Sequence, residues 1–416
     1  MNQQVVENNS GKFSLKDKIK AMGPAVVIVG SFLGPGTVTT ATRTGAGFGY
    51  GLLWTIIFSV IATIVLQEMS ARLGIITQEE LSKHIVDIFE EKPVLKSIAI
   101  LFVGGAITLG GIAYMSGDLI GTSLGVSNVT GIPTNYIAPI IGVIILFIIN
   151  MGDIKWLEKI LSVLVALMVF VFVVTMVVVK PDLGELTKGF VPVIPKGGLM
   201  NCIALIGTTI VPYNLFIHCS NAKKHWKTPE ELELSKWGTY TAITIGGIIT
   251  ASVMITAAAV MKGMPVNSAA DMAVQLEPTL GKYANLFMSV GLFSAGLSSA
   301  ICTPLGVSYV LGGLLGWKLD KSDKRFLYTN IGILLLGIIG SATGINPLSI
   351  IIAAQALNGI FLPVIVIFLV YITCSKNVLG KYVNSKAVTV LGVFISIITF
   401  VLGTSSVLSV IKTLFG

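Results

Sequence analysis

The chain is a succession of continuous apolar segments separated by short polar connections. Most of the segments are long enough to cross about 30 Å of hydrocarbon as a helix, and their apolar residues do not alternate as they would in a membrane strand. We therefore predict an all-α, polytopic membrane protein with eleven transmembrane helices. Their expected ranges are 25–45, 50–73, 97–123, 137–150, 157–179, 199–218, 238–261, 284–315, 326–342, 346–373 and 388–411.

Composition supports the same class. Of 416 residues, 54% are hydrophobic and 12% are charged, whereas a soluble domain carries roughly 25% charged residues. Residues 1–23 are polar and rich in lysine, without the pattern of a cleaved signal peptide, so we expect them to form a cytoplasmic tail. The first apolar segment is then expected to act as the insertion signal.

The net charge of +8 is best explained by membrane topology. Most Lys and Arg residues fall in alternate connections, which predicts a cytoplasmic N-terminus and an external C-terminus in a plasma membrane of bacterial type. The basic segment 221–227 is then a cytoplasmic loop and not a nucleic-acid contact. The expected partners are the lipid bilayer and a small ion or small molecule. We expect no cofactor and no enzyme activity, and the pattern leaves the oligomeric state open.

Two apolar segments contain helix-breaking residues at matching positions. The first carries Gly34-Pro35-Gly36, and the sixth carries Pro212 within "GTTIVPYN". Proline and glycine interrupt a helix, and unwound backbone is tolerated in a membrane where it is buried or lines a cavity. Paired interruptions are typical of an inverted repeat with a substrate site at the midplane.

The predicted breaks divide the chain into two halves. Residues 24–190 form a first five-helix repeat with an external loop, and residues 191–375 form a second repeat. Residues 376–416 form a loop and an eleventh helix, which we expect to be an additional helix facing lipid.

Several motifs resemble the natural resistance-associated macrophage protein (Nramp) family. They are "LLWTIIFSVIATIVLQEMSARLGIITQEEL" (52–81), "GDLIGTSLG" with "GIP" (117–133), "GTTIVPYNLFIHCS" (207–220), "FSAGLSSAICTPLG" (293–306) and "AQALNGIFLPVI" (354–365). The resemblance covers the first ten spans. It implies a leucine-transporter-like fold and secondary transport of divalent metal ions, usually with protons.

The binding motifs themselves depart from the family. The first break has glycine and threonine where family metal transporters have aspartate and asparagine, and the second has valine and tyrosine for methionine and histidine. The resemblance also implies a backbone carbonyl from Thr208 and an amide from the tenth span. The substrate-binding residues implied are Gly34, Gly36, Thr37, Thr208, Val211, Tyr213, Asn214 and Gln355, with Pro35 and Pro212 as the helix breaks.

These departures change the expected ion chemistry. Loss of the thioether removes a preference for softer metals, and loss of the carboxylate removes charge compensation for a dehydrated divalent ion. Thr37, Thr208 and Gln355 remain as candidate metal ligands. Because they are neutral oxygen donors, we expect a hydrated hard cation such as magnesium to be favoured over manganese or iron.

Proton coupling is also expected to be absent, since the aspartate of the first break and the histidine of the second are missing. Two intramembrane acids remain as coupling candidates, Asp118 and Glu68. Glu68 lies four residues before Arg72, a spacing that favours a structural ion pair. For Asp118, coupling and stabilisation of a buried network are equally open.

Two alternatives stay open. The chain is also compatible with transport of a small organic solute such as an amino acid, with or without sodium, through the hydroxyls of Thr37, Thr39, Thr208 and Thr209. A sensor or scaffold that has lost transport is compatible with the fold, although the sequence offers no feature that favours it. Paired helix breaks favour alternating access over a permanent channel.

Overall fold

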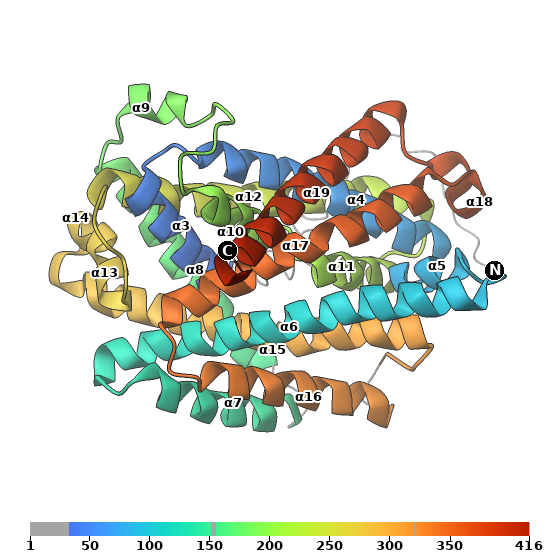
Figure 1. Ribbon diagram of the computed structural model, residues 1–416, viewed down its shortest axis with the longest axis horizontal. Coiled ribbons are helices and arrows are strands. Elements are labelled where there is room, and N and C mark those ends of the chain that lie inside the picture. Colours follow the sequence, from blue (N-terminus) through green and yellow to red (C-terminus); the bar gives the residue numbers. More distant parts are fainter. Residues whose placement is uncertain (1–32, 151–154, 320–321, 416) are drawn as a thin grey trace, which may run out of the picture.

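The computed structural model describes residues 33–150, 155–319 and 322–415, and within these ranges every regular element is a helix (Figure 1). The long helices are α3 (Pro35–Phe48), α4 (Leu53–Thr77), α6 (Pro93–Thr130), α7 (Thr134–Asn150), α8 (Lys155–Val178), α10 (Leu199–Thr209), α11 (Pro212–His225), α12 (Leu232–Val260), α15 (Ala284–Leu315), α16 (Lys324–Ser341), α17 (Pro347–Cys374) and α19 (Lys386–Phe415). Short helices in the connections are α5 (Leu81–Asp87), α9 (Leu183–Lys188), α13 (Ala269–Ala273), α14 (Glu277–Leu280) and α18 (Lys376–Leu379).

The all-α membrane class is confirmed. Seven helical stretches in the described part of the chain are long and apolar enough to cross a membrane, and two shorter apolar helices accompany them. The total of eleven spans stays a prediction. The predicted tail 1–23 and the part of the first span before residue 33 lie outside the described residues.

Helix boundaries follow local chemistry more than apolarity. The predicted span 97–123 is a longer helix, because Pro93 suits its first turn and Gly131, with φ 74°, ends it in the left-handed conformation. The helix therefore extends beyond its apolar centre at both ends. In contrast, the predicted span 284–315 coincides with α15.

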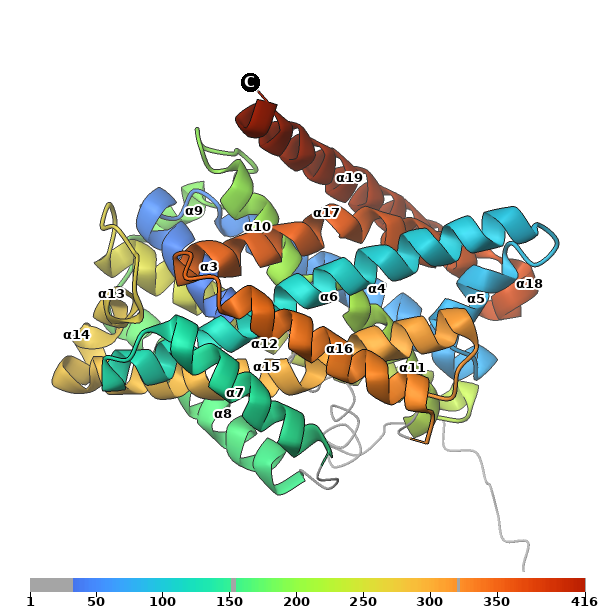
Figure 2. The same ribbon diagram turned by 60° about the horizontal axis from the view of Figure 1, so that its bottom comes forward.

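α3 and the two halves of the interrupted sixth span, α10 and α11, lie at the centre of the bundle. α6 runs alongside α15 and α17, while α3 packs against α10, α12 and α17 (Figure 1). α19 packs on α17 at the edge of the bundle and is largely uncovered by protein, as a helix facing lipid would be (Figure 2). Because other helices surround α10 and α11, the unwound backbone between them is shielded from lipid.

Glycine allows backbone contact between α10 and α17. A Cβ atom built on Gly207 would lie 2.0 Å from the Gln355 carbonyl oxygen and 2.8 Å from the Gly359 nitrogen. Close approach of this kind is typical of membrane helix interfaces, where small residues replace the hydrophobic driving force. The contact brings the end of α10 next to Gln355.

We expect Gly207→Ala to destabilise the protein by roughly 1–3 kcal/mol, because the backbone of α17 cannot turn aside from the added methyl group. Gly105→Ala in α6 is the matched control: among the described residues, no atom outside that helix's own backbone lies within 4 Å of its Cβ position. Thermal unfolding of the purified protein in detergent measures both. Equal melting temperatures for the two variants would contradict the close contact.

Candidate functional site

The sixth predicted span is interrupted at its middle, which confirms the second helix break. α10 ends at Thr209 and α11 begins at Pro212, while Ile210 (φ −99°, ψ 76°) and Val211 (φ −78°, ψ 119°) leave the helical region. Proline has no N–H to continue the hydrogen bonds of α10, but its fixed φ suits the first position of the next helix. The two half-helices therefore meet at an unwound segment.

The start of α3 lies against this segment. Gly34 is extended (φ −79°, ψ −176°) and Pro35 occupies the first turn of the helix. The Gly34 carbonyl oxygen accepts hydrogen bonds from the backbone N–H groups of Thr37 (3.1 Å) and Val38 (3.4 Å). The α3 half of the first break is thus described, and the preceding half lies outside the described residues.

A group of neutral polar side chains gathers between the two breaks, which we call the threonine cluster: Thr37, Thr208, Gln355 and Tyr114. The hydroxyl oxygens of Thr37 and Thr208 lie 2.7 Å apart and join α3 to α10. The Gln355 amide occupies the space over Gly36, where a Cβ atom would lie 2.0 Å from Nε2. The side chain of Tyr114 in α6 interacts electrostatically with those of Thr208 and Gln355.

Two polar atoms of the threonine cluster are buried without a hydrogen bond of ordinary geometry to any described residue. They are Gln355 Oε1 and the Tyr114 hydroxyl. An unsatisfied buried polar atom costs about 1–3 kcal/mol, so a water molecule or a bound ligand at this place would be stabilising. The cluster can therefore supply neutral oxygen atoms to a substrate.

A second group, the Asp118 cluster, lies on the other side of the α3 start. It comprises Asp118 of α6, Ser299 and Thr303 of α15, and Tyr213 of α11. Ser299 and Thr303 each donate a hydrogen bond of 2.9 Å to Asp118 Oδ2. The Tyr213 hydroxyl oxygen lies 3.1 Å from Thr303 Oγ1. A Cβ atom on Gly34 would lie 3.3 Å from Ser299 Oγ and 3.6 Å from Asp118 Oδ1.

The donor set decides which metals the centre can hold. No group of three or more His, Cys, Asp or Glu side chains comes together anywhere in the described ranges. The tetrahedral nitrogen and sulfur sites of zinc are thus not formed there. Hydroxyl, amide and single-carboxylate oxygens suit hard cations instead.

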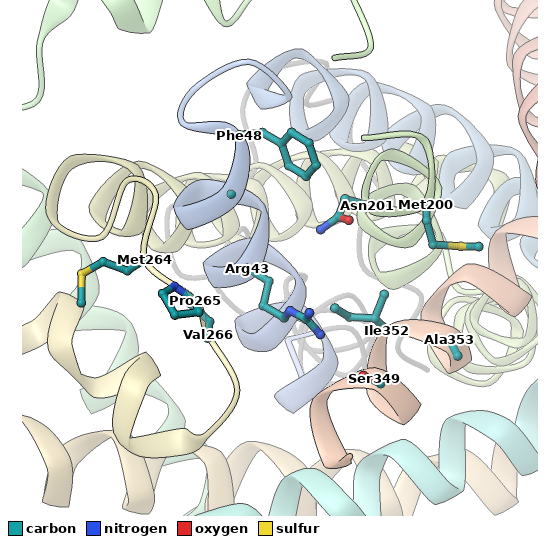
Figure 3. Close-up of a pocket in the computed structure, with 11 residues that line it drawn as sticks. Arg43, Phe48, Met200, Asn201, Met264, Pro265, Val266, Ser349, Ile352 and Ala353 are labelled. Atoms are coloured by element: carbon teal, nitrogen blue, oxygen red, sulfur yellow. The ribbon is translucent and has the colours of Figure 1, made fainter. Parts of the chain in front are cut away.

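A cavity of about 500 Å³ opens at the end of the bundle where α3 ends and α10 and α17 begin. It is lined by Arg43, Phe48, Met200, Asn201 and Ile352, among others, and Figure 3 shows the Arg43 side chain projecting into it from α3. Arg43, Asn201 and Ile352 lie about one to two turns from the threonine cluster on the same helices, and Phe48 lies about three turns from it. The cavity is therefore positioned as a vestibule.

At the opposite end of the bundle, α11 is joined to the segment that precedes α5. Glu80 pairs with Lys223 at 2.7 Å and accepts a 3.2 Å hydrogen bond from Ser220. Gln78 donates a 3.1 Å hydrogen bond to the Trp226 carbonyl oxygen. A second cavity of about 580 Å³, lined by Glu79, Glu80 and Lys83 among others, lies at this same end beside α5.

Of the other predicted site residues, some lie at the helix break and some face other parts of the bundle. Val211 and Asn214 are buried at the break, where the Asn214 N–H donates to the Val211 carbonyl oxygen at 3.1 Å. Thr39 faces Met272 and Thr209 bonds to the Leu205 carbonyl oxygen of its own helix. Successive helical residues point about 100° apart, so the four threonines cannot all face one substrate.

Glu68 lies in an ion-pair network away from the breaks. Arg72 Nε and Nη2 donate to the two Glu68 carboxylate oxygens, both at 3.0 Å. Arg72 also donates to the carbonyl oxygen of Tyr382 and the side chain of Asn384, which precede α19, and Lys236 adds a contact of 3.4 Å to Glu68. These contacts favour the structural role over coupling.

Sequence reasoning missed Tyr114, Ser299 and Thr303 as site residues. Ser299 and Thr303 are four residues apart in an apolar helix and so share one face. That spacing lies inside the motif 293–306, and it is the signal that could have identified them. Tyr114 carries no comparable signal, because a single tyrosine in an apolar helix is more often packed in a core.

The packed apolar helices and the interrupted sixth span form a leucine-transporter-like fold in a membrane protein. A family model described as natural resistance-associated macrophage protein-like matches residues 25–409, and the chain belongs to this family.

Individual relatives agree with this membership. The chain is 29% identical over 402 residues to the divalent metal cation transporter MntH of Klebsiella pneumoniae, covering 94% of each chain. The fold is similar to that of the Eremococcus coleocola manganese transporter in complex with an aromatic bis-isothiourea substituted compound (TM-score 0.81, 22% identity, 99% of this chain and 90% of that chain). It is also similar to MhsT in complex with L-phenylalanine (TM-score 0.60, 16% identity, 97% and 100%).

We expect Arg72→Gln to destabilise the protein by about 3–5 kcal/mol, because it leaves the buried Glu68 carboxylate without its bidentate partner. The matched control is Lys83→Gln, which removes an exposed pair with Glu79 at the same spacing of four residues and should change stability little. The apparent melting temperature in detergent reports both. A similar small shift for the two variants would show that the network contributes little to folding.

Proposed function

We propose that the protein is a secondary transporter of divalent cations whose site favours a hydrated hard cation such as magnesium over manganese or iron. The observation that carries this proposal is the threonine cluster, in which the two helix breaks present hydroxyl and amide oxygens without sulfur or imidazole. Membership of a family whose relatives include divalent metal cation transporters supports the cation class.

The selectivity follows from ligand chemistry. Magnesium dehydrates reluctantly and commonly keeps several of its waters, so it can be held through hydrogen bonds to neutral side chains. Manganese and iron gain more from softer or charged ligands, and none of the four side chains of the threonine cluster provides one. A partly hydrated ion also spreads its charge, which lowers the cost of entering a buried site.

Transport without proton symport is the second part of the proposal. Glu68 is held by Arg72 and Lys236, which makes it a poor proton carrier. Tyr213 stands where family members carry the histidine of the second break. Asp118 is then the remaining coupling candidate of the two.

Thr208→Val should lower magnesium uptake into proteoliposomes by about tenfold, equivalent to ~1.4 kcal/mol, because it removes a hydroxyl from the Thr37 contact. Thr209→Val is the matched control, since that hydroxyl bonds to its own helix. Uptake of magnesium, manganese and calcium is compared with and without a proton gradient.

Saturable magnesium uptake at the same rate with and without the proton gradient supports the proposal. Manganese uptake driven by the gradient would overturn both the selectivity and the uncoupled mechanism. Absence of flux for all three ions, in protein that remains folded, would exclude them as substrates.

A second function is favoured by one observation, the Arg43 side chain in the vestibule. A cavity of about 500 Å³ with apolar walls and a single guanidinium suits a small amphipathic carboxylate such as an amino acid. The same positive charge would disfavour the approach of cations. A small organic carboxylate is therefore the alternative substrate.

Arg43→Gln separates the two functions. If divalent cations are the substrate, removing the positive charge should raise their uptake rate, more strongly at low than at high ionic strength. If a carboxylate solute is the substrate, its uptake should fall instead. Lys196→Gln, in the exposed loop before α10, is the control for a general change in surface charge.

A further inference from the structure

We propose that the Asp118 cluster is a binding site for a small monovalent cation, with Na⁺ as its probe, at the start of α3. The site is distinct from the threonine cluster and uses Asp118, Ser299, Thr303 and Tyr213 from three helices. It does not depend on whether the cargo is a divalent cation or an organic solute.

The first observation is a carboxylate with no charged partner among the residues that the structure describes. Asp118 is 1% exposed in the middle of α6, and its polar contacts in the described part of the chain are the hydroxyls of Ser299 and Thr303. A buried carboxyl group is normally either protonated or paired with a cation, because an isolated charge in a low-dielectric interior is very costly. A bound cation supplies that missing charge.

The second observation is the crowding of oxygen atoms around this carboxylate. The contacts of Asp118 with Ser299 and Thr303 are 2.9 Å, and the Thr303–Tyr213 contact is 3.1 Å. Thr303 Oγ1 also donates to the Ser299 carbonyl oxygen at 3.1 Å. Carboxylate, hydroxyl and carbonyl oxygens are the ligands of hard cations. Each hydroxyl that now donates a proton can rotate to offer a lone pair.

Charge and size then select the ion. One carboxylate neutralises one positive charge, whereas a divalent ion stripped of its waters would leave a net charge buried among neutral hydroxyls. Oxygens that lie about 3 Å apart enclose a small ion better than a large one. Na⁺ fits both conditions, and K⁺ is the natural comparison.

Because the site borders the start of α3, a bound ion would affect the conformation of the helix break. A Cβ atom on Gly34 would lie 3.3 Å from Ser299 Oγ and 3.6 Å from Asp118 Oδ1, so the unwound start of α3 forms one wall of the site. A cation here would hold α3 against α6 and α15. Since α3 also carries Thr37, occupancy of this site would be linked to substrate binding in the threonine cluster.

The test is binding of ²²Na⁺ to the purified full-length protein in detergent, without any cargo, at constant ionic strength and competed by Li⁺, K⁺ and choline. We expect saturable binding with a stoichiometry of one ion per chain, competed poorly by K⁺ and not by choline. A saturable rise in melting temperature with Na⁺, absent with K⁺, should accompany it.

Variants assign the site. Asp118→Asn should abolish binding, and Ser299→Ala should weaken it by about tenfold. Ser294→Ala is the matched control in α15, because that hydroxyl bonds to the Val290 carbonyl oxygen of its own helix. If Asp118→Asn does not fold, the wild-type and Ser299→Ala titrations decide the question.

Three results would overturn the proposal: no specific Na⁺ binding by folded wild type, undiminished binding by Asp118→Asn, or equal effects of Ser299→Ala and Ser294→Ala. A response of wild type to pH alone, without Na⁺ dependence, would identify the carboxyl group as a proton site instead. Because cargo is absent, failure here leaves the uptake of magnesium to be judged separately.

Discussion

The centre of the molecule depends on one contact, the 2.7 Å approach of the Thr37 and Thr208 hydroxyls between the start of α3 and the end of α10. Both helices stop or begin there because proline and glycine interrupt the hydrogen-bond ladder. Interrupted backbone is stable within a membrane when protein covers it, and the packing of α6, α15 and α17 around the breaks provides that cover. The packing that stabilises the interrupted backbone is therefore the same packing that forms the site.

Two kinds of polar surface meet at the α3 start. The threonine cluster is neutral and holds buried polar atoms without partners among the described residues. The Asp118 cluster carries one carboxylate and satisfies it with hydroxyls. Gly34, which faces the carboxylate, and Thr37, which belongs to the neutral cluster, are separated by about one turn of α3. This division allows a substrate and a charge-compensating ion to be held at separate places, with α6 contributing Tyr114 to one and Asp118 to the other.

Much of the architecture was predictable from local patterns. Apolar length indicated the membrane class, and proline with glycine indicated where the sixth span breaks, because both signals act within one or two turns. Boundaries were less accurate, as α6 shows, since helices continue into the interface until a capping residue such as Gly131 ends them. The Glu68–Arg72 pair was foreseen from its spacing of four residues.

What the sequence alone determined is the class of protein, the break within the sixth span and the types of ligand atom available beside it. What the tertiary structure decided is which of those atoms share a site. Thr37 and Thr208 are 171 residues apart and meet, whereas Thr39 and Thr209 point to other neighbours. Ser299 and Thr303 join Asp118 although 181 and 185 residues separate them from it. Such meetings depend on how the helices pack and rotate against each other, and no local pattern specifies that.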